Sequence, residues 1–275
     1  MQEDPYAAQK EHLHNLRTDL ETPIYDELRS KYGQALKAAW DSTTFPQTSS
    51  NTVMLVERRA HPNIEFVLHN VMYFASMSRP FSLTIVCCKE NEQFIRTILG
   101  KHEQSTHFIV PWDTNSHRDI ARPEYNTLMK DPEFWNQVRA DYVLSIQTDC
   151  YLRKPLPDIL WTLDYVAAPW AWKPWVVGGS GLTFRRRQAV IEMCKKGFTR
   201  IIAEDEFFAI QCAATKRKVL PLEEAEHIFA ESRFVSEDPV GVHQWWTYMY
   251  QSDDAKFIQK FRDIYMTIRL KISAP

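Results

Sequence analysis

The sequence predicts an α/β fold in which a mostly parallel sheet is covered by helices on both faces. From residue 52 onward, short apolar runs alternate with helical stretches, which is the order typical of parallel sheets with crossover helices. The runs at residues 83–87 and 142–146 are apolar along most of their length, as in strands buried on both faces. A chain of 275 residues, 44% of them hydrophobic, is large enough to form such a core.

The expected strands and helices follow one another in the order that this fold requires. Strands are expected at residues 53–56, 83–87, 108–110, 143–146, 165–168 and 182–184. Helices are expected at residues 64–74, 92–99, 131–138, 187–195 and, at the C-terminus, 252–275. Because the run at 143–146 is the most apolar, we expect it to be a central strand.

The beginning of the chain has a different pattern and is expected to be a helical extension. Apolar residues recur at spacings of three and four within residues 5–40, which gives one apolar stripe. Pro23 is expected to open a second helix, with Thr22 as its cap. The stripe is expected to pack on the main domain or, alternatively, to form a homodimer. The expected divisions are an extension with its linker (1–50), a main domain (51–250) and a C-terminal helix (251–275).

Composition argues against several classes of protein. A net charge of −2 gives no general field that attracts nucleic acid, and the chain has neither a G-x-G-x-x-G fingerprint nor a P-loop. The five cysteines contain no C-x-x-C pair, which argues against a disulfide framework and a zinc site. No window approaches the roughly 20 apolar residues of a membrane span. The polar start predicts a cytoplasmic protein, or a protein of the Golgi or endoplasmic reticulum lumen if a membrane anchor is missing from this chain.

Asp149 and His243 are candidates for a metal site. Asp149 follows the most apolar run, so its carboxylate is expected at the carboxyl edge of the sheet, where open α/β sheets bind ligands. A carboxylate there can hold Mg²⁺ or Mn²⁺, which leave coordination positions for substrate phosphates. The alternative is that Asp149 caps the following turn. The imidazole of His243 could complete the metal shell, although a lone histidine is more often a packed residue.

Three of the seven glycines, Gly178, Gly179 and Gly181, fall within four positions. A glycine loop of this kind brings backbone amides close to a ligand, or permits positive φ in a plain turn. Its position just before an expected strand favours close approach to a ligand.

The acidic run Glu204, Asp205 and Glu206 precedes an apolar helical stretch. Such residues are typical of a helix N-terminus, where carboxylates complement the helix dipole. One of them could also act as a general base for a hydroxyl acceptor. In that role its pKa must stay below the working pH, which a nearby metal ion would favour.

Three of the nine tryptophans, Trp170, Trp172 and Trp175, lie within six positions. Exposed indoles can stack on the faces of sugar rings, whereas buried indoles belong to the core. Prolines at positions 169 and 174 predict a loop here, so we expect the indoles to form a wall of a binding site.

Six short motifs together resemble one known family. They are residues 56–63, 147–149, 168–170, 178–182, 204–208 and 241–243. Together they are similar to a family known mainly as a domain of unknown function, which is grouped with glycosyltransferases of the GT-A fold. The resemblance covers about residues 52–250 and implies a GT-A-like, Rossmann-like sheet for the main domain.

The resemblance implies a divalent cation as cofactor. In GT-A enzymes, a D-x-D motif at the end of a central strand holds the cation against a nucleotide diphosphate. The matching positions here are Gln147, Thr148 and Asp149, so glutamine replaces the first aspartate. The resemblance implies that Asp149 and His243 are ligands of Mn²⁺ or Mg²⁺ and that Thr148 contacts the donor.

The resemblance also implies which residues bind the donor. Glu57 and Arg58 match the region that meets the nucleotide base and ribose. Gly178, Gly179 and Gly181 match a turn beside the donor sugar. The tryptophans are expected to contact the acceptor or the donor sugar.

The resemblance extends to inverting β1,3-type transferases, in which an aspartate of an acidic pair acts as base. That position corresponds to Asp205, with Glu204 and Glu206 as alternatives. The sequence thus predicts a metal-dependent, inverting glycosyltransferase that uses a nucleotide-sugar donor and the hydroxyl of a glycan, protein or small molecule. One alternative is a nucleotidyltransferase-like enzyme, which would need a glycine and lysine cradle after the first strand. The other is a non-catalytic binding relative, in which Gln147 marks the loss of metal.

Overall fold

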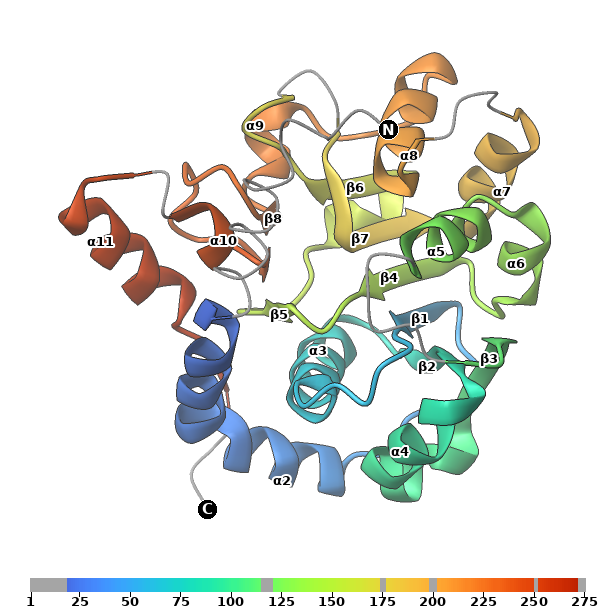
Figure 1. The fold of residues 1–275 in the computed structure, drawn as a ribbon, viewed down its shortest axis with the longest axis horizontal. Helices are drawn as coiled ribbons and strands as arrows, with labels where there is room; N and C mark the ends of the chain where they lie inside the picture. The colour runs from blue at the N-terminus through green and yellow to red at the C-terminus, as the bar shows by residue number, and fades with distance from the viewer. Residues whose placement is uncertain (1–18, 115–120, 174–176, 198–201, 250–251, 272–275) are drawn as a thin grey trace, which may run out of the picture.

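The computed structural model describes residues 19–114, 121–173, 177–197, 202–249 and 252–271, and its centre is one six-stranded sheet (Figure 1). In sheet order the strands are Thr106–Trp112 (β3), Ser82–Cys88 (β2), Asn51–Val56 (β1), Tyr142–Ile146 (β4), Gly179–Arg186 (β7) and Tyr165–Ala168 (β6). β3, β2, β1 and β4 are parallel, and β7 is antiparallel to both of its neighbours. The expected α/β fold with a mostly parallel sheet is confirmed.

The register of the two central strands brings the candidate residues to one edge of the sheet. In the parallel pairing of β1 with β4, Leu55 lies opposite Ile146. The chain then continues to Glu57 after β1 and to Asp149 after β4. Because the carboxyl ends of parallel strands meet at the same edge, these two segments are neighbours.

Helices cover both faces of the sheet and enclose two hydrophobic clusters (Figure 1). Alternate residues of β1 belong to different clusters, Val53 and Leu55 to the first and Met54 and Val56 to the second. Burial on both faces explains why the apolar run of β1 is continuous and does not alternate with polar residues. The first cluster includes α2 (Gln34–Ser42), α3 (Ile64–Ser78), α4 (Lys89–Leu99) and α11 (Ala255–Tyr265), and the second includes α5 (Ala121–Met129), α6 (Pro132–Gln137), α7 (Arg187–Lys195) and α8 (Glu204–Ala214).

The N-terminal helices pack on the main domain. Residues 19–28 are helical, the π-helix η1 (Arg29–Gly33) follows, and α2 continues the chain. The expected new helix at Pro23 is wrong, because the chain is helical on both sides of this residue. A proline removes one backbone donor, and the burial of the neighbouring Ile24 and Tyr25 outweighs that loss.

Tyr25 ties this helix to the segment that carries the candidate site. Its hydroxyl donates a hydrogen bond to the carbonyl oxygen of Cys150 at 3.1 Å. Its ring makes edge-to-face contacts with Phe66, Tyr151 and Trp246. The part of the apolar stripe that the structure describes is therefore buried within the chain at Ile24, Leu28 and Leu36, and a homodimer through the stripe remains a prediction.

A second, three-stranded sheet carries the late histidine. Its strands, in sheet order, are Cys150–Leu152 (β5), Gly241–His243 (β9) and Phe229–Ala230 (β8). β5 and β9 are antiparallel, and Cys150 lies opposite His243. Because β5 begins directly after Asp149, this pairing places the histidine beside that aspartate.

The later part of the chain corrects two expectations. β7 begins at Gly179 rather than near residue 182, so the glycines Gly179 and Gly181 lie within a strand and not in a loop. The expected C-terminal helix over 252–275 is too long, because α11 begins at Ala255 and ends at Tyr265, and it packs on the domain through Phe261 and Tyr265. The remaining short elements are η2 (Gly100–Ser105), η3 (Asp158–Thr162), α9 (Leu222–Ala225) and α10 (Trp246–Met249).

Among the helices of the described residues, none is both long and apolar enough to cross a membrane.

Candidate metal centre and surrounding site

Asp149 and His243 form a buried pair at the carboxyl edge of the central strands. Asp149 lies in the turn between β4 and β5, and His243 ends β9. The Oδ1 atom of Asp149 lies 3.2 Å from Nε2 of His243. The structure thus brings together the two residues that the sequence suggested as metal ligands.

Glu231 is a third buried residue of this cluster, and sequence reasoning missed it. It directly follows β8, which pairs in parallel with β9, and its Oε2 lies 3.5 Å from Nδ1 of His243. Its Oε1 accepts hydrogen bonds from the Gln244 side chain at 3.3 Å and from the Tyr248 hydroxyl at 3.4 Å. The only sequence signal was an acidic residue after a short apolar run. We call Asp149, His243 and Glu231 the acid–imidazole cluster.

Gly179 and Gly181 leave room for this cluster. They are two residues apart on β7 and therefore point to the same side of the strand. A Cβ atom at Gly181 would lie 1.9 Å from Nε2 of His243, and one at Gly179 would lie 2.8 Å from Oε2 of Glu231. Gly178 has a φ of +99°, in the region that favours glycine. The glycine signal thus marks a strand packed closely on the cluster, and any contact of these glycines with a donor remains a prediction.

The pair of Asp149 and His243 fits a divalent cation that is bound by few protein ligands. In the part of the chain that the structure describes, no group of three or more His, Cys, Asp or Glu side chains is arranged to hold a metal ion. The pair offers one oxygen and one nitrogen 3.2 Å apart, a separation that two ligands at about 2.0–2.2 Å from one ion can have. Within the described residues, both ring nitrogens of His243 are buried without a hydrogen-bond partner. The other coordination positions would suit phosphate oxygens and water.

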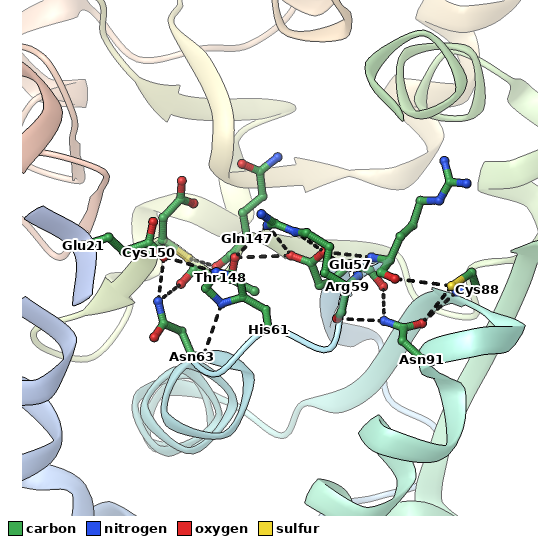
Figure 2. A network of polar contacts seen from close by, with 12 residues as sticks. Glu21, Glu57, Arg59, His61, Asn63, Cys88, Asn91, Gln147, Thr148 and Cys150 are labelled. Carbon is green, nitrogen blue, oxygen red and sulfur yellow. Dashed lines mark hydrogen bonds and ion pairs between the residues drawn. The ribbon is translucent and has the colours of Figure 1, made fainter. Parts of the chain in front are cut away.

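Glu57 is held in a fixed orientation at the end of β1 (Figure 2). Its Oε1 accepts hydrogen bonds from the backbone N–H groups of Arg58 and Arg59, each at 2.9 Å. Its Oε2 pairs with the Arg59 guanidinium at 2.7 Å and accepts a hydrogen bond from the Thr148 hydroxyl at 3.3 Å. Burial alone would raise the pKa of Glu57, but the hydrogen bonds and charge of Arg59 lower it below its usual value. An ionised carboxylate therefore lies beside the turn that carries Asp149.

The two arginines after Glu57 have different surroundings. Arg58 is buried, with its guanidinium 4.7 Å from the centre of the Trp112 ring and paired with Glu124. Arg59 is 46% exposed at the same edge of the sheet. Arg59, which lies in the motif at 56–63 but was not predicted to bind the donor, is therefore the better placed of the two to contact an anionic ligand.

Glu204 is buried under the first turn of α8. Its Oε2 lies 3.6 Å from the Arg185 guanidinium, and its Oε1 accepts a hydrogen bond from the Tyr125 hydroxyl at 3.3 Å. Gln147, in the place of the first aspartate of D-x-D, hydrogen-bonds to Tyr125 in the same layer. Glu204 thus neutralises a buried cation, which favours a structural role for it.

A Glu204→Gln variant is expected to lower the free energy of unfolding by about 3–5 kcal/mol, because it leaves the charge of Arg185 buried and unpaired. Denaturant titration measures this loss. The matched control is Glu206→Gln, because the pair of Glu206 with Lys173 is partly exposed and should contribute no more than about 1 kcal/mol. Equal stability of the two variants would contradict a structural role for Glu204.

Asp205 differs from its neighbour in being only half-buried. Burial, followed by the negative charge of Glu204 and then by Glu231 and Glu206, raises the pKa of Asp205 to about 6. A pKa of about 6 is below neutral pH, as the role of a base requires. The N-cap residue of α8 is Ala203, so Asp205 does not cap the helix. Glu231 of the acid–imidazole cluster is among the charges that raise the pKa of Asp205.

Trp172 forms an exposed aromatic surface beside the cluster. It is 45% exposed, stacks on Trp170 at a centroid distance of 5.9 Å and contacts the Tyr248 ring at 5.2 Å. Because the Tyr248 hydroxyl also donates to Glu231, the indole surface adjoins the acid–imidazole cluster. Trp170 itself is buried, and Trp175 lies outside the described residues.

Two cavities lie away from this cluster. An apolar cavity of about 240 Å³ is lined by residues of β6, α8 and α9, and another of about 520 Å³ by residues of α2 and α3. Neither is lined by Asp149, His243 or Glu231. Titratable side chains at the sheet edge, rather than the volume of a cavity, therefore define the candidate site.

Comparison with known proteins gives a family match over part of the chain. Residues 113–243 match the family model described as "Protein of unknown function (DUF5672)", which confirms the resemblance to a domain of unknown function over these residues. No curated protein matches the sequence. Among solved structures, the chain is similar to a mannosyltransferase (PcManGT) from Pyrobaculum calidifontis in complex with GDP-Man and Mn²⁺, with 15% sequence identity and a TM-score of 0.42. The similarity covers 76% of this chain and 66% of that chain, so this chain spans slightly less than two thirds of the mannosyltransferase.

Proposed function

We propose that this protein is a glycosyltransferase of the GT-A type, which transfers a sugar from a nucleotide-sugar donor to a hydroxyl acceptor. The observation that carries the proposal is the contact of Asp149 with His243 at 3.2 Å, at the carboxyl edge of the parallel strands. Open α/β sheets bind ligands at this edge. The two residues also match the D-x-D aspartate and the late histidine of the resembling enzymes.

Asp149 and His243 would hold a divalent cation, Mn²⁺ or Mg²⁺. When bound, the cation would supply positive charge to the departing nucleoside diphosphate. A mixed oxygen and imidazole ligand set favours Mn²⁺, because Mg²⁺ prefers oxygen ligands throughout. Gln147, which stands in place of the first aspartate of D-x-D, contacts Tyr125. The pair of Asp149 and His243 is formed without it.

Glu57, Arg59 and Thr148 are proposed to contact the nucleotide part of the donor. The partly exposed guanidinium of Arg59 can pair with diphosphate oxygens in a charge-assisted hydrogen bond. The carboxylate of Glu57 is ionised and, because it binds both Arg59 and Thr148, would orient these residues toward the donor. Arg58 would stabilise the segment after β1 through its contact with the Trp112 ring.

Asp205 is proposed as the base of a direct inversion. The acceptor oxygen forms a bond to the anomeric carbon, the bond from that carbon to the phosphate oxygen breaks, and the hydroxyl proton passes to the Asp205 carboxylate. A pKa of about 6 suits this role, because the group is mostly ionised at neutral pH and yet basic enough to take the proton.

Trp172 is proposed as a wall of the acceptor or donor-sugar pocket, and a Trp172→Ala variant tests this role. We expect the acceptor KM to rise about 2- to 12-fold, the value of one lost stacking contact. Stability should change little, since the indole is 45% exposed. The matched control is Trp135→Ala, which removes a fully buried indole and should cost about 3–5 kcal/mol of stability. A large fall in melting temperature with unchanged KM would identify Trp172 as a core residue instead.

A thermal-shift screen of nucleotides with and without Mn²⁺ tests the proposed function against its alternatives. A ligand that binds only the folded state raises the melting temperature. A glycosyltransferase should be stabilised by one nucleoside diphosphate in the presence of Mn²⁺. Stabilisation by triphosphates alone would favour a nucleotidyltransferase-like enzyme. No shift with any nucleotide would favour a binding relative without metal chemistry.

A further inference from the structure

Glu231 is a buried carboxylate that takes no part in the proposed reaction steps. We propose that Glu231 is a positioning residue that orients the His243 imidazole toward the cation, an inference that rests on the proposed function. Histidines that bind metals commonly donate their other ring N–H to a carboxylate, which fixes the tautomer and the orientation of the ring.

The two oxygens of Glu231 have separate partners. Oε1 accepts hydrogen bonds from Gln244 and Tyr248, at 3.3 Å and 3.4 Å. Oε2 faces Nδ1 of His243 at 3.5 Å, while the other ring nitrogen, Nε2, faces Asp149. Glu231 therefore contacts the nitrogen that does not face Asp149. It would act on the cation through the histidine and not as a direct ligand.

The backbone around the cluster is shaped to keep this arrangement. Any side chain at Gly179 or Gly181 would collide with Glu231 or His243, at Cβ distances of 2.8 Å and 1.9 Å. Gln244 has a φ of +32°, which is rare for a residue other than glycine. In this conformation its backbone N–H donates to the Asp149 carbonyl oxygen at 2.8 Å while its side chain donates to Glu231. One residue in a strained conformation thus holds both ends of the cluster.

A Glu231→Gln variant removes the proposed function of the carboxylate without changing its shape. Oε1 of Glu231 accepts hydrogen bonds from Gln244 and Tyr248, and Oε2 lies 3.5 Å from Nδ1 of His243. An amide has only one acceptor oxygen, so at least one of these contacts must be lost. We expect the affinity for Mn²⁺, measured by calorimetry with the nucleoside diphosphate present, to fall about 10- to 100-fold. The matched control is Glu226→Gln, which removes the charge of another buried carboxylate, paired with Arg233, and should leave Mn²⁺ affinity unchanged.

The tautomer of His243 in the metal-free protein gives a second readout, obtained by long-range ¹H–¹⁵N NMR. We expect the wild-type protein to carry the proton on Nδ1 and the Glu231→Gln variant to lose this preference. A wild-type protein with the proton on Nε2 would overturn the proposal, even if the variant fails to fold. So would unchanged Mn²⁺ affinity in a folded Glu231→Gln variant of a protein that binds Mn²⁺. If the wild-type protein binds no Mn²⁺, the proposed function fails, and the NMR spectrum alone decides whether Glu231 orients the imidazole.

Discussion

An Asp149→Asn variant is expected to lose Mn²⁺-dependent binding of nucleoside diphosphates while keeping its fold. Asparagine has the shape of aspartate but no negative charge, so the imidazole of His243 would be the only strong protein ligand left in the pair. We expect the affinity to fall by at least about 100-fold, since even residues behind the metal ligands change affinity by 10- to 100-fold. Isothermal titration calorimetry with and without Mn²⁺ measures this effect.

The fold of this variant should survive because a backbone group holds the turn. The carbonyl oxygen of Asp149, not its side chain, accepts the N–H of Gln244 at 2.8 Å. The matched control is Asp158→Asn, because Asp158 is 91% exposed and forms only a surface pair with Arg79. This control should bind nucleotide as the wild-type protein does. Unchanged affinity in Asp149→Asn would exclude this carboxylate from the nucleotide site.

An Asp205→Asn variant is expected to lower kcat by about 10²- to 10⁴-fold with little change in donor binding. The amide cannot accept the proton of the acceptor hydroxyl, while the residues proposed to bind the donor are unchanged. Steady-state kinetics gives kcat, and calorimetry gives donor affinity. A carboxylate that only stabilises the first turn of α8 would instead contribute about 0.3–1 kcal/mol of stability, with near wild-type turnover of the variant. The latter outcome, or a product with retained anomeric configuration, would contradict the role of Asp205 as base.

The pKa of Asp205 also predicts how the rate depends on pH. The base must be deprotonated, and its pKa is raised to about 6 by burial and neighbouring carboxylates. The rate should therefore be maximal above pH 6 and fall as the pH drops through 6, because the carboxylate becomes protonated. The residual rate of Asp205→Asn should lack this acid limb. A wild-type rate that stays constant from pH 7 to pH 5 would contradict the assignment.

The central sheet was predictable from the sequence because most of its strands contain a short apolar run. The run at 143–146 was expected to be central, and β4 lies between β1 and β7. The continuity of the helix through Pro23 was not predictable, because it depends on the burial of Ile24 and Tyr25 against residues far along the chain. Tertiary packing here overrides a local signal.

The candidate site was predictable where a residue directly follows a recognisable strand. Asp149 is such a residue, and the motif pattern named His243. Glu231 could not be found in this way, because its place in the cluster depends on the pairing of two short strands, β8 and β9, that carry little sequence signal. The glycines were recognised as unusual, and the structure adds a packing reason for two of them, while their contact with a donor stays a prediction. Gly181 is small because His243 packs against it, and that contact exists only in the folded chain.

Some of the sequence predictions are not tested by this structure. The cytoplasmic location, the homodimer through the N-terminal stripe and the division into three segments all remain predictions. The role of Trp175 also remains one, because this residue lies outside the described part of the structure.

The most direct test of the central claim is the release of nucleoside diphosphate from a panel of nucleotide sugars, with Mn²⁺ or with a chelator. We predict that one donor is cleaved in the presence of Mn²⁺ and that the chelator or the Asp149→Asn substitution abolishes this release. Release at the same rate without metal and in the Asp149→Asn variant would contradict the account. So would a protein that neither binds nor cleaves any nucleotide sugar of the panel.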